Sequence, residues 1–316
     1  MLNFADDATL EWQLKRLHLA FIRRSWRDVV ERAEREQWSY RDFLAVLTGE
    51  EVAHRTQTGI ERRTHQARFP FLRTIEEFNF SHQSALRVTM LGSYLGPEYV
   101  ASGANLILEG SPGRGKTHLA IAIAYKAIIN GFDALFVTAS ELIEELSTAA
   151  EQGRMGECLK RYVSPGVLVI DEVGYLSLRE NAANVLYHVI NQRYLKKKPV
   201  VLTTNKGLTR WGQVLHDEDL ASAIVDRLLH HGRLIKLDGP SQRTNSRSPG
   251  LADHPQPVRV SGISPSYLTE PTPCGTHSRL AQAIGLKAWC HRPVAHVGKH
   301  IHRAAPRSGR RPCRRP

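Results

Sequence analysis

The spacing of apolar residues changes along the chain at about residue 100. Before that point, apolar side chains recur three or four positions apart, as on one face of a helix, for example at Leu10, Leu14, Leu17 and Phe21. After it, short apolar runs alternate with amphipathic segments, which is typical of an α/β fold with a parallel sheet. We therefore expect an all-helical N-terminal domain followed by a parallel sheet flanked by helices.

Two helices are predicted in the second half of the N-terminal region. Ser39 and Asp42 resemble the start of a capping box, which would open a helix through Leu47. A further helix is expected from Glu50 to Arg68. It should stop before Pro70, because the residue that precedes a proline disfavours helical geometry.

The α/β part divides into alternating elements. Continuous apolar runs at 167–170 and 200–203 indicate buried parallel strands. Further strands are expected at 106–108, 134–138 and 234–237, and helices at 116–130, from 141 onward, at 179–197 and at 221–231.

A phosphate-binding loop is predicted between the first expected strand and the helix that follows it. The residues fit the pattern G-x-x-x-x-G-K-[ST]: Gly110, Ser111, Pro112, Gly113, Arg114, Gly115, Lys116 and Thr117. Glycines allow backbone N–H groups to converge on polyphosphate oxygens, and the helix N-terminus adds positive potential. We expect ATP here, with Lys116 on the β and γ phosphates and the Thr117 hydroxyl on Mg²⁺. His118 lies next to this loop in sequence, without an assigned mechanism.

Polar side chains follow two buried strands of the predicted sheet. Asp171 and Glu172 come after the run 167–170, and Asn205 follows 200–203. Ligands bind at the carboxyl edge of such sheets. Asp171 is therefore expected to hold Mg²⁺, Glu172 to act as general base on water, and Asn205 to orient that water. For Asn205, an ordinary turn-capping role is the alternative.

The net charge of +12 is unevenly distributed. Residues 246–316 carry +10 and hold ten of the 16 prolines, so we expect a basic, disordered tail. This tail could grip phosphates or have no function; its Cys and His spacing matches no compact zinc finger. A second basic stretch lies on the helix expected from Glu50, where a DNA-backbone contact is favoured over a solvated face: Arg55, Arg62, Arg63 and Arg68.

Several classes of protein are disfavoured by composition. Four cysteines are too few for a disulfide scaffold. The most apolar stretch, 119–129, is interrupted by Lys126 and is shorter than the roughly 20 residues of a spanning helix. Acidic residues occupy the start, where a signal peptide would be cationic. We expect a cytoplasmic protein without membrane contact.

Together these residues resemble the IstB-like ATP-binding proteins, transposition helper ATPases of the AAA+ superfamily related to bacterial helicase loaders. The resemblance covers about residues 10–245. Besides the ATPase motifs, it is carried by segments that ATPases in general do not share: 39–44, 67–70, 74–80, 115–120, 170–175, 203–205 with Trp211, and 226–231.

The resemblance implies functions that composition and spacing do not supply. It implies ATP-dependent assembly on double-stranded target DNA, delivery of that DNA to a partner transposase, and homo-oligomers with ATP between neighbouring subunits. Arg227 falls where an arginine finger would reach the next subunit's γ-phosphate, the alternative being an ion pair with Asp226 or at the surface, and Arg243 could sense nucleotide. Family members usually end soon after Arg243, so the tail could be an out-of-frame extension.

The expected organisation is a helical domain over 1–80 for DNA and partner contacts, an AAA+ domain over 81–245 and the tail over 246–316. Three other functions stay open. A helicase loader would share every ATP residue and differ in partner, a DNA-binding remnant would not turn ATP over, and a small-molecule kinase would transfer the phosphoryl group. Glu172 directly after Asp171, with Asn205 and Arg227, favours water as the acceptor.

Overall fold

The protein was analysed as a computed structural model, which describes residues 6–83, 86–174 and 181–239. The basic tail over 246–316 and Arg243 lie outside these residues. No helix in the described ranges is both long and apolar enough to reach across a membrane.

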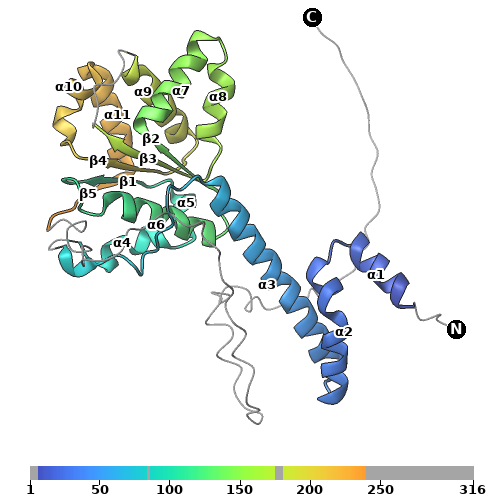
Figure 1. Ribbon diagram of the computed structural model, residues 1–316. Helices are drawn as coiled ribbons and strands as arrows, with labels where there is room; N and C mark the ends of the chain where they lie inside the picture. Colours follow the sequence, from blue (N-terminus) through green and yellow to red (C-terminus); the bar gives the residue numbers. More distant parts are fainter. Residues whose placement is uncertain (1–5, 84–85, 175–180, 240–316) are drawn as a thin grey trace, which may run out of the picture. The chain divides into compact units, whose positions relative to one another are not determined.

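The centre of the protein is a five-stranded sheet in which every strand pair is parallel. Its strands run in the order β2-β3-β4-β1-β5 (Figure 1). Their bounds are β1 Asn105–Glu109, β2 Ala134–Thr138, β3 Val167–Val173, β4 Val200–Thr204 and β5 Gly232–Lys236. Because β4 lies between β1 and β3, the loops that leave the carboxyl ends of these three strands are neighbours at one edge of the sheet.

Helices cover both faces of this sheet (Figure 1). Alternate residues of each strand point to opposite faces, so Leu106 and Leu108 join one apolar cluster and Ile107 joins the other. One face is covered by α4 (Val88–Leu95), α5 (Glu98–Ser102) and α6 (Lys116–Ile129). The other is covered by α7 (Ala139–Glu151), α8 (Met155–Val163), α9 (Ala182–Leu195), α10 (Trp211–Leu215) and α11 (Glu218–His230). This is the expected AAA+ P-loop fold.

The described chain begins with three helices, α1 (Asp7–Arg16), α2 (Ala20–Arg35) and α3 (Tyr40–Gln66), which come before the helices that cover the sheet. The all-helical N-terminal region is thus confirmed. Its buried apolar side chains are few: Leu14, Ile22 and Val29. Large apolar side chains such as Trp12 and Tyr40 are exposed instead. Most of this region's surface is therefore available to solvent or to partners.

Two predictions about helix boundaries were wrong. The helices expected at 39–47 and from Glu50 form one helix, α3, which runs through Gly49 because its packing against α2 outweighs the roughly 1 kcal/mol cost of a helical glycine. Conversely, the run of apolar residues from Leu10 to Phe21 breaks at His18, which has a φ of 55°. Leu19 N–H donates to the Leu14 carbonyl over 3.0 Å, as in a Schellman motif. Because that motif normally carries glycine, the break at His18 was not predicted.

The last turn of α3 packs on the sheet. Ile60 and the fully buried Ala67 belong to the apolar cluster that includes β2. The Ala67 carbonyl accepts a hydrogen bond from Phe136 N–H of the edge strand β2, over 2.8 Å. Downstream, Phe78 joins the same cluster. The end of α3 and the segment after it are therefore fixed against the sheet.

Candidate functional site

The phosphate loop connects β1 to α6, as the sequence predicted. Gly113 and Gly115 have φ values of 79° and 88°, in the left-handed region that glycine adopts without strain. Gly110 has no room for a side chain, since an added Cβ would lie 2.6 Å from the Leu237 carbonyl oxygen. The side chain of Lys116 folds back over the loop, where its Nζ donates to the Ser111 carbonyl over 3.0 Å.

Asp171 lies at the centre of a hydrogen-bonded cluster at the sheet edge. The Thr117 hydroxyl is 3.0 Å from both of its carboxylate oxygens, and the Thr203 hydroxyl donates to Oδ1 over 2.5 Å. Burial raises the pKa of Asp171, and this effect outweighs its hydrogen bonds and the nearby Lys116 charge. Hydroxyl and carboxylate oxygens are the ligands that Mg²⁺ prefers, so Thr117 and Asp171 fit the expected ion.

Glu172 lies outside the regular pairing of the strands, whereas Asp171 lies within it. The pairing of β3 with β4 shifts register between Ile170 and Val173, and Glu172 in this bulge has a φ of 63°. Left-handed backbone costs a non-glycine residue about 1–3 kcal/mol and is concentrated at functional sites. The Glu172 side chain is exposed, while its N–H donates to Thr203 Oγ1 over 2.9 Å. The bulge thus separates a buried carboxylate from an accessible one.

Thr203 was not singled out from the sequence. Its hydroxyl is fully buried, donates to Asp171 and accepts from the Glu172 backbone, so it fixes both acidic residues. The sequence feature that could have identified Thr203 is a hydroxyl residue at the end of a buried apolar run, on a strand next to the one that carries Asp171.

Asn205 follows β4 at the same edge. Its Oδ1 is buried and has no hydrogen-bond partner among the described residues. Because buried polar atoms are almost always paired, an unpartnered amide oxygen at this place is consistent with a water or ligand contact.

A cavity of about 500 Å³ opens beside these acidic residues. Thr117, Asp171 and Glu172 line it from the sheet edge. Arg68, which directly follows the C-cap of α3, lines it from the other side. The sequence placed Arg68 on a DNA-contact helix, whereas the structure places it at a cavity that Glu172 also lines.

His118, expected from the sequence beside the phosphates, contacts the segment that follows α3. Its Nε2 donates to the Thr74 carbonyl over 3.0 Å, and its ring packs edge-to-face on Phe78 at 5.3 Å. Burial lowers the pKa of His118. A contact that the sequence did not suggest reaches the loop nearby, where Gln83 Nε2 donates to the Arg114 carbonyl over 3.2 Å.

Arg227 lies on α11 and packs against α9. Its guanidinium donates to Asn191 Oδ1 over 3.0 Å, to Tyr187 Oη over 3.1 Å and to the Ala223 carbonyl over 2.9 Å. It also stacks over the Tyr187 ring at 4.8 Å. All of these partners belong to its own chain and are uncharged, so its charge is not neutralised by them.

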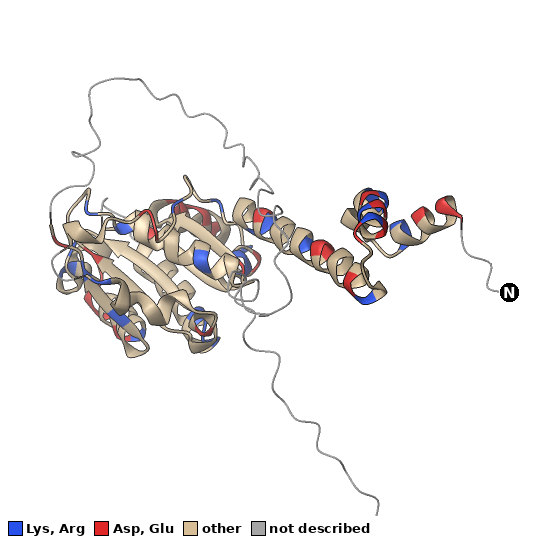
Figure 2. Cartoon of the chain, turned by 90° about the horizontal axis from the view of Figure 1, so that it is seen from below, with Lys and Arg blue, Asp and Glu red and all other residues tan. Residues whose placement is uncertain are grey.

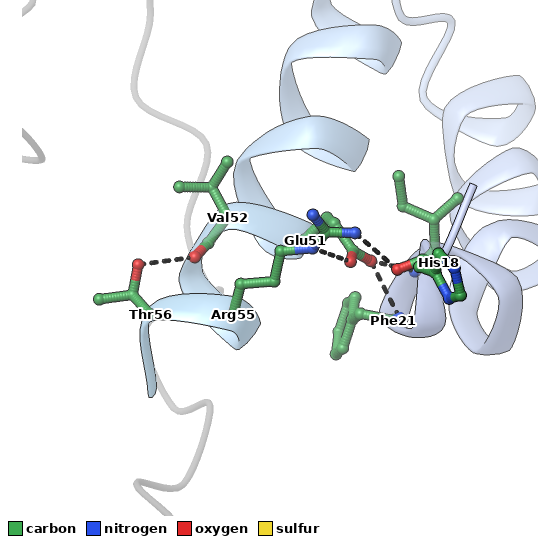
Figure 3. Close-up of polar contacts among 7 residues, drawn as sticks. His18, Phe21, Glu51, Val52, Arg55 and Thr56 are labelled. Atoms are coloured by element: carbon green, nitrogen blue, oxygen red, sulfur yellow. Dashed lines mark hydrogen bonds and ion pairs between the residues drawn. The ribbon is translucent and has the colours of Figure 1, made fainter. Parts of the chain in front are cut away.

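The predicted DNA-contact arginines differ in their surroundings. Arg55 is tied to the N-terminal helices: its Nε donates to Glu51 over 2.7 Å and its Nη2 to the His18 carbonyl over 2.5 Å (Figure 3). Arg63 pairs with Asp133 at 3.3 Å, next to β2. Arg62 is exposed. Basic and acidic residues are intermingled along the N-terminal helices (Figure 2).

Comparisons with known proteins give the family. The model for IstB-like ATP binding proteins matches residues 12–250. The ATP-binding protein of insertion sequence IS21 from Pseudomonas aeruginosa is 36% identical over 238 residues, which cover 75% of this chain and 89% of that protein. Its counterpart in IS5376 from Geobacillus stearothermophilus is 36% identical over 232 residues, which cover 73% of this chain and 92% of that protein.

Solved structures include a similar helicase loader, DnaC, with 28% identity and a TM-score of 0.40 over 48% of this chain and 88% of that one. The family assignment rests on the sequence matches, which span the phosphate loop, both acidic residues and most of the N-terminal helices. This chain belongs to the IstB-like ATP-binding proteins.

Proposed function

We propose that the protein is an ATPase that assembles on double-stranded target DNA, hydrolyses ATP and delivers the DNA to a partner transposase. The observation that supports it most is the cluster of Thr117, Asp171 and Thr203 beside the accessible carboxylate of Glu172. The relatives' names, ATP-binding proteins of insertion sequences, supply the biological setting. DNA and ATP meet in the cytoplasm, where we expect the protein to act.

In this proposal each residue of the site has a distinct task. The loop amides and Lys116 bind the phosphates, while Thr117 and Asp171 hold Mg²⁺, which neutralises phosphate charge when bound. Thr203 keeps the Asp171 carboxylate in place by its hydrogen bond. Glu172, exposed beside the cavity, accepts a proton from the attacking water, and Asn205 orients that water through its amide.

The direct test is steady-state ATP hydrolysis with and without double-stranded DNA. We expect magnesium-dependent turnover that DNA stimulates. A protein that binds ATP and DNA but never hydrolyses ATP would be the inactive remnant instead. Transfer of the phosphoryl group to a metabolite would identify a kinase.

We further propose that the active form is a homo-oligomer in which Arg227 acts on the ATP of a neighbouring subunit. In the free chain its hydrogen bonds to Asn191 and Tyr187 would hold the guanidinium on α9 until a neighbour docks. Mixing two inactive variants tests this, because Arg227→Ala retains an intact phosphate loop and Lys116→Ala retains the arginine. Recovered turnover in the mixture supports action between subunits, and no recovery with mixed oligomers formed contradicts it.

DNA binding is proposed to involve the exposed side of α3, with Arg62 as the residue least occupied by contacts within the chain. Arg62→Glu should weaken DNA binding and flatten its salt dependence by about one phosphate contact. Co-purification with a transposase or with a replicative helicase then separates the transposition role from that of a helicase loader.

A further inference from the structure

Arg68 occupies an unusual backbone position at the end of α3. Its φ is 58°, in the left-handed region that few residues with side chains adopt. The preceding residue, Ala67, is fully buried and held by the hydrogen bond from Phe136 N–H to its carbonyl, 2.8 Å long. The backbone that carries Arg68 is therefore fixed by the edge of the sheet.

The cavity brings this residue together with the ATP site. Arg68 lines it from α3, Thr117 from α6, and Asp171 and Glu172 from β3. Two of its lining residues, Arg68 and Glu172, are non-glycine residues with left-handed backbone. Because such conformations persist where the surrounding structure enforces them, both sides of the cavity have constrained positions.

Two cationic side chains line the cavity, and Arg68 is the one without an ion pair within the described residues. The other, Arg161, pairs with Glu145 at 2.6 Å. Within the described ranges, no carboxylate lies at ion-pair distance from the exposed Arg68, Glu172 across the cavity included, so the Arg68 guanidinium is available to a group in the cavity. A guanidinium stays charged at all accessible pH values.

We propose that Arg68 is a positioning residue for ATP hydrolysis, which orients the Glu172 carboxylate and connects it to α3. The inference rests on the proposed ATPase function. Glu172 must be correctly aimed to accept a proton from water. A cation fixed across the cavity attracts the Glu172 carboxylate and restrains its direction.

Helix α3 connects Arg68 to the N-terminal helices. Near its C-terminal end, α3 is held to the sheet by Ala67 and by the ion pair of Arg63 with Asp133. Toward its N-terminal end it is joined to α2 through Glu51, which accepts from Phe21 N–H and Ile22 N–H (Figure 3). A ligand such as DNA that binds α2 or α3 thus acts on the helix that ends directly before Arg68.

The test compares Arg68→Gln and Arg68→Lys with Arg233→Gln, at an exposed arginine of β5 that does not line the cavity. The readouts are kcat and KM for ATP at saturating DNA, and the Kd for DNA. For Arg68→Gln we expect kcat to fall at least about tenfold, less than the roughly 10²–10³-fold cost of losing a donor that touches the transition state. KM and Kd should stay within about twofold, and Arg68→Lys should recover part of kcat. Arg233→Gln should keep kcat, KM and Kd at their wild-type values.

Two results would overturn the inference. If Arg68→Gln weakens DNA binding and flattens its salt dependence while kcat at saturating DNA is unchanged, Arg68 is a DNA contact. If both Arg68 variants keep wild-type kcat, KM and Kd in an active protein, Arg68 has no positioning role, although the ATPase proposal survives. Absence of turnover in the wild-type protein, by contrast, would refute the ATPase proposal itself. Thermal unfolding of each variant confirms that folded proteins are compared.

Discussion

The carboxyl edge of the sheet and the N-terminal helices use polar residues in opposite ways. At the sheet edge, Asp171 is buried and bonded to two hydroxyls, beside a cavity that remains accessible. In the helices, Glu51 is equally buried, but its carboxylate is occupied by two backbone N–H groups and Arg55. The arrangement around Asp171 leaves room for a ligand, whereas the arrangement around Glu51 joins α2 to α3.

This difference shows why burial of a carboxylate does not by itself identify a site. Both carboxylates lose contacts with water on burial, and both gain hydrogen bonds within the protein that offset this loss. At Asp171 the net effect is a raised pKa, since burial outweighs the hydrogen bonds. At Glu51 burial also raises the pKa, but the bonds from Ile22, Arg55 and Phe21 outweigh it and the net shift is downward. A cation would stabilise the Asp171 carboxylate, whereas the Glu51 carboxylate already has Arg55 as its cationic partner.

The largest expected effect comes from Lys116→Ala, which should abolish nucleotide binding because the phosphates lose their principal cation. Binding of a fluorescent ATP analogue measures it. Lys126→Ala, on the same helix but outside the loop, is the control and should bind as the wild type does. Retained affinity in Lys116→Ala would mean that the sheet edge does not bind phosphate as described.

Glu172→Gln should bind ATP normally and slow its hydrolysis by about 10²–10⁴-fold, the range that loss of a general base produces. Single-turnover hydrolysis separates binding from chemistry. The variant should also stay on DNA longer, because release would await hydrolysis. Wild-type turnover would remove Glu172 from the proposed role.

Thr203→Val should destabilise the fold by about 1.5–3 kcal/mol, since a hydrogen bond to a buried charge is lost. Thr204→Val is a comparison in which only bonds to uncharged backbone groups are lost. The Thr204 hydroxyl donates to the Val173 carbonyl over 2.8 Å and accepts from Lys206 N–H over 3.1 Å, and each such bond should cost only about 0.5–1.5 kcal/mol. Urea unfolding midpoints give both values. Equal costs would argue that Asp171 does not depend on Thr203.

The smallest effect is expected for Glu51→Gln, which should weaken the joint of α2 and α3 by about 1 kcal/mol without changing ATP affinity. The pKa of Glu51 is lowered in the folded protein, so its contribution is complete above the ordinary value of 4.5 and is lost as pH falls through the lower folded value. The stability difference from wild type should shrink over that acidic range. Glu50→Gln serves as the control, and a difference independent of pH would contradict the assignment.

Features set by residues close together in the chain were predicted from the sequence more reliably than features set by contacts between distant segments. The loop from Gly110 to Thr117 and the strand ending at Asp171 were predictable, because glycine conformations, apolar runs and helix starts are local. The break at His18 was not, since its left-handed cap lacks the usual glycine. The α8 and α10 helices were also missed, both short and stabilised by packing on the sheet.

Contacts between distant segments were the least predictable part of the site. Thr203 reaches Asp171 only because β4 lies beside β3, and Arg68 reaches the cavity only because α3 ends on β2. The pattern of basic residues predicted a DNA-contact helix, but it did not reveal that Arg55 and Arg63 have acidic partners within the chain. The proposed roles in DNA binding therefore remain predictions.

Calorimetric titration of the folded protein with ATP, with and without Mg²⁺, tests the central claim that Thr117 and Asp171 form a magnesium nucleotide site at the sheet edge. We predict saturable binding to one site per chain that is weakened by removal of Mg²⁺, with the metal dependence lost in Asp171→Asn. No heat of binding with Mg²⁺, or binding by Asp171→Asn that keeps the full metal dependence, would contradict the account.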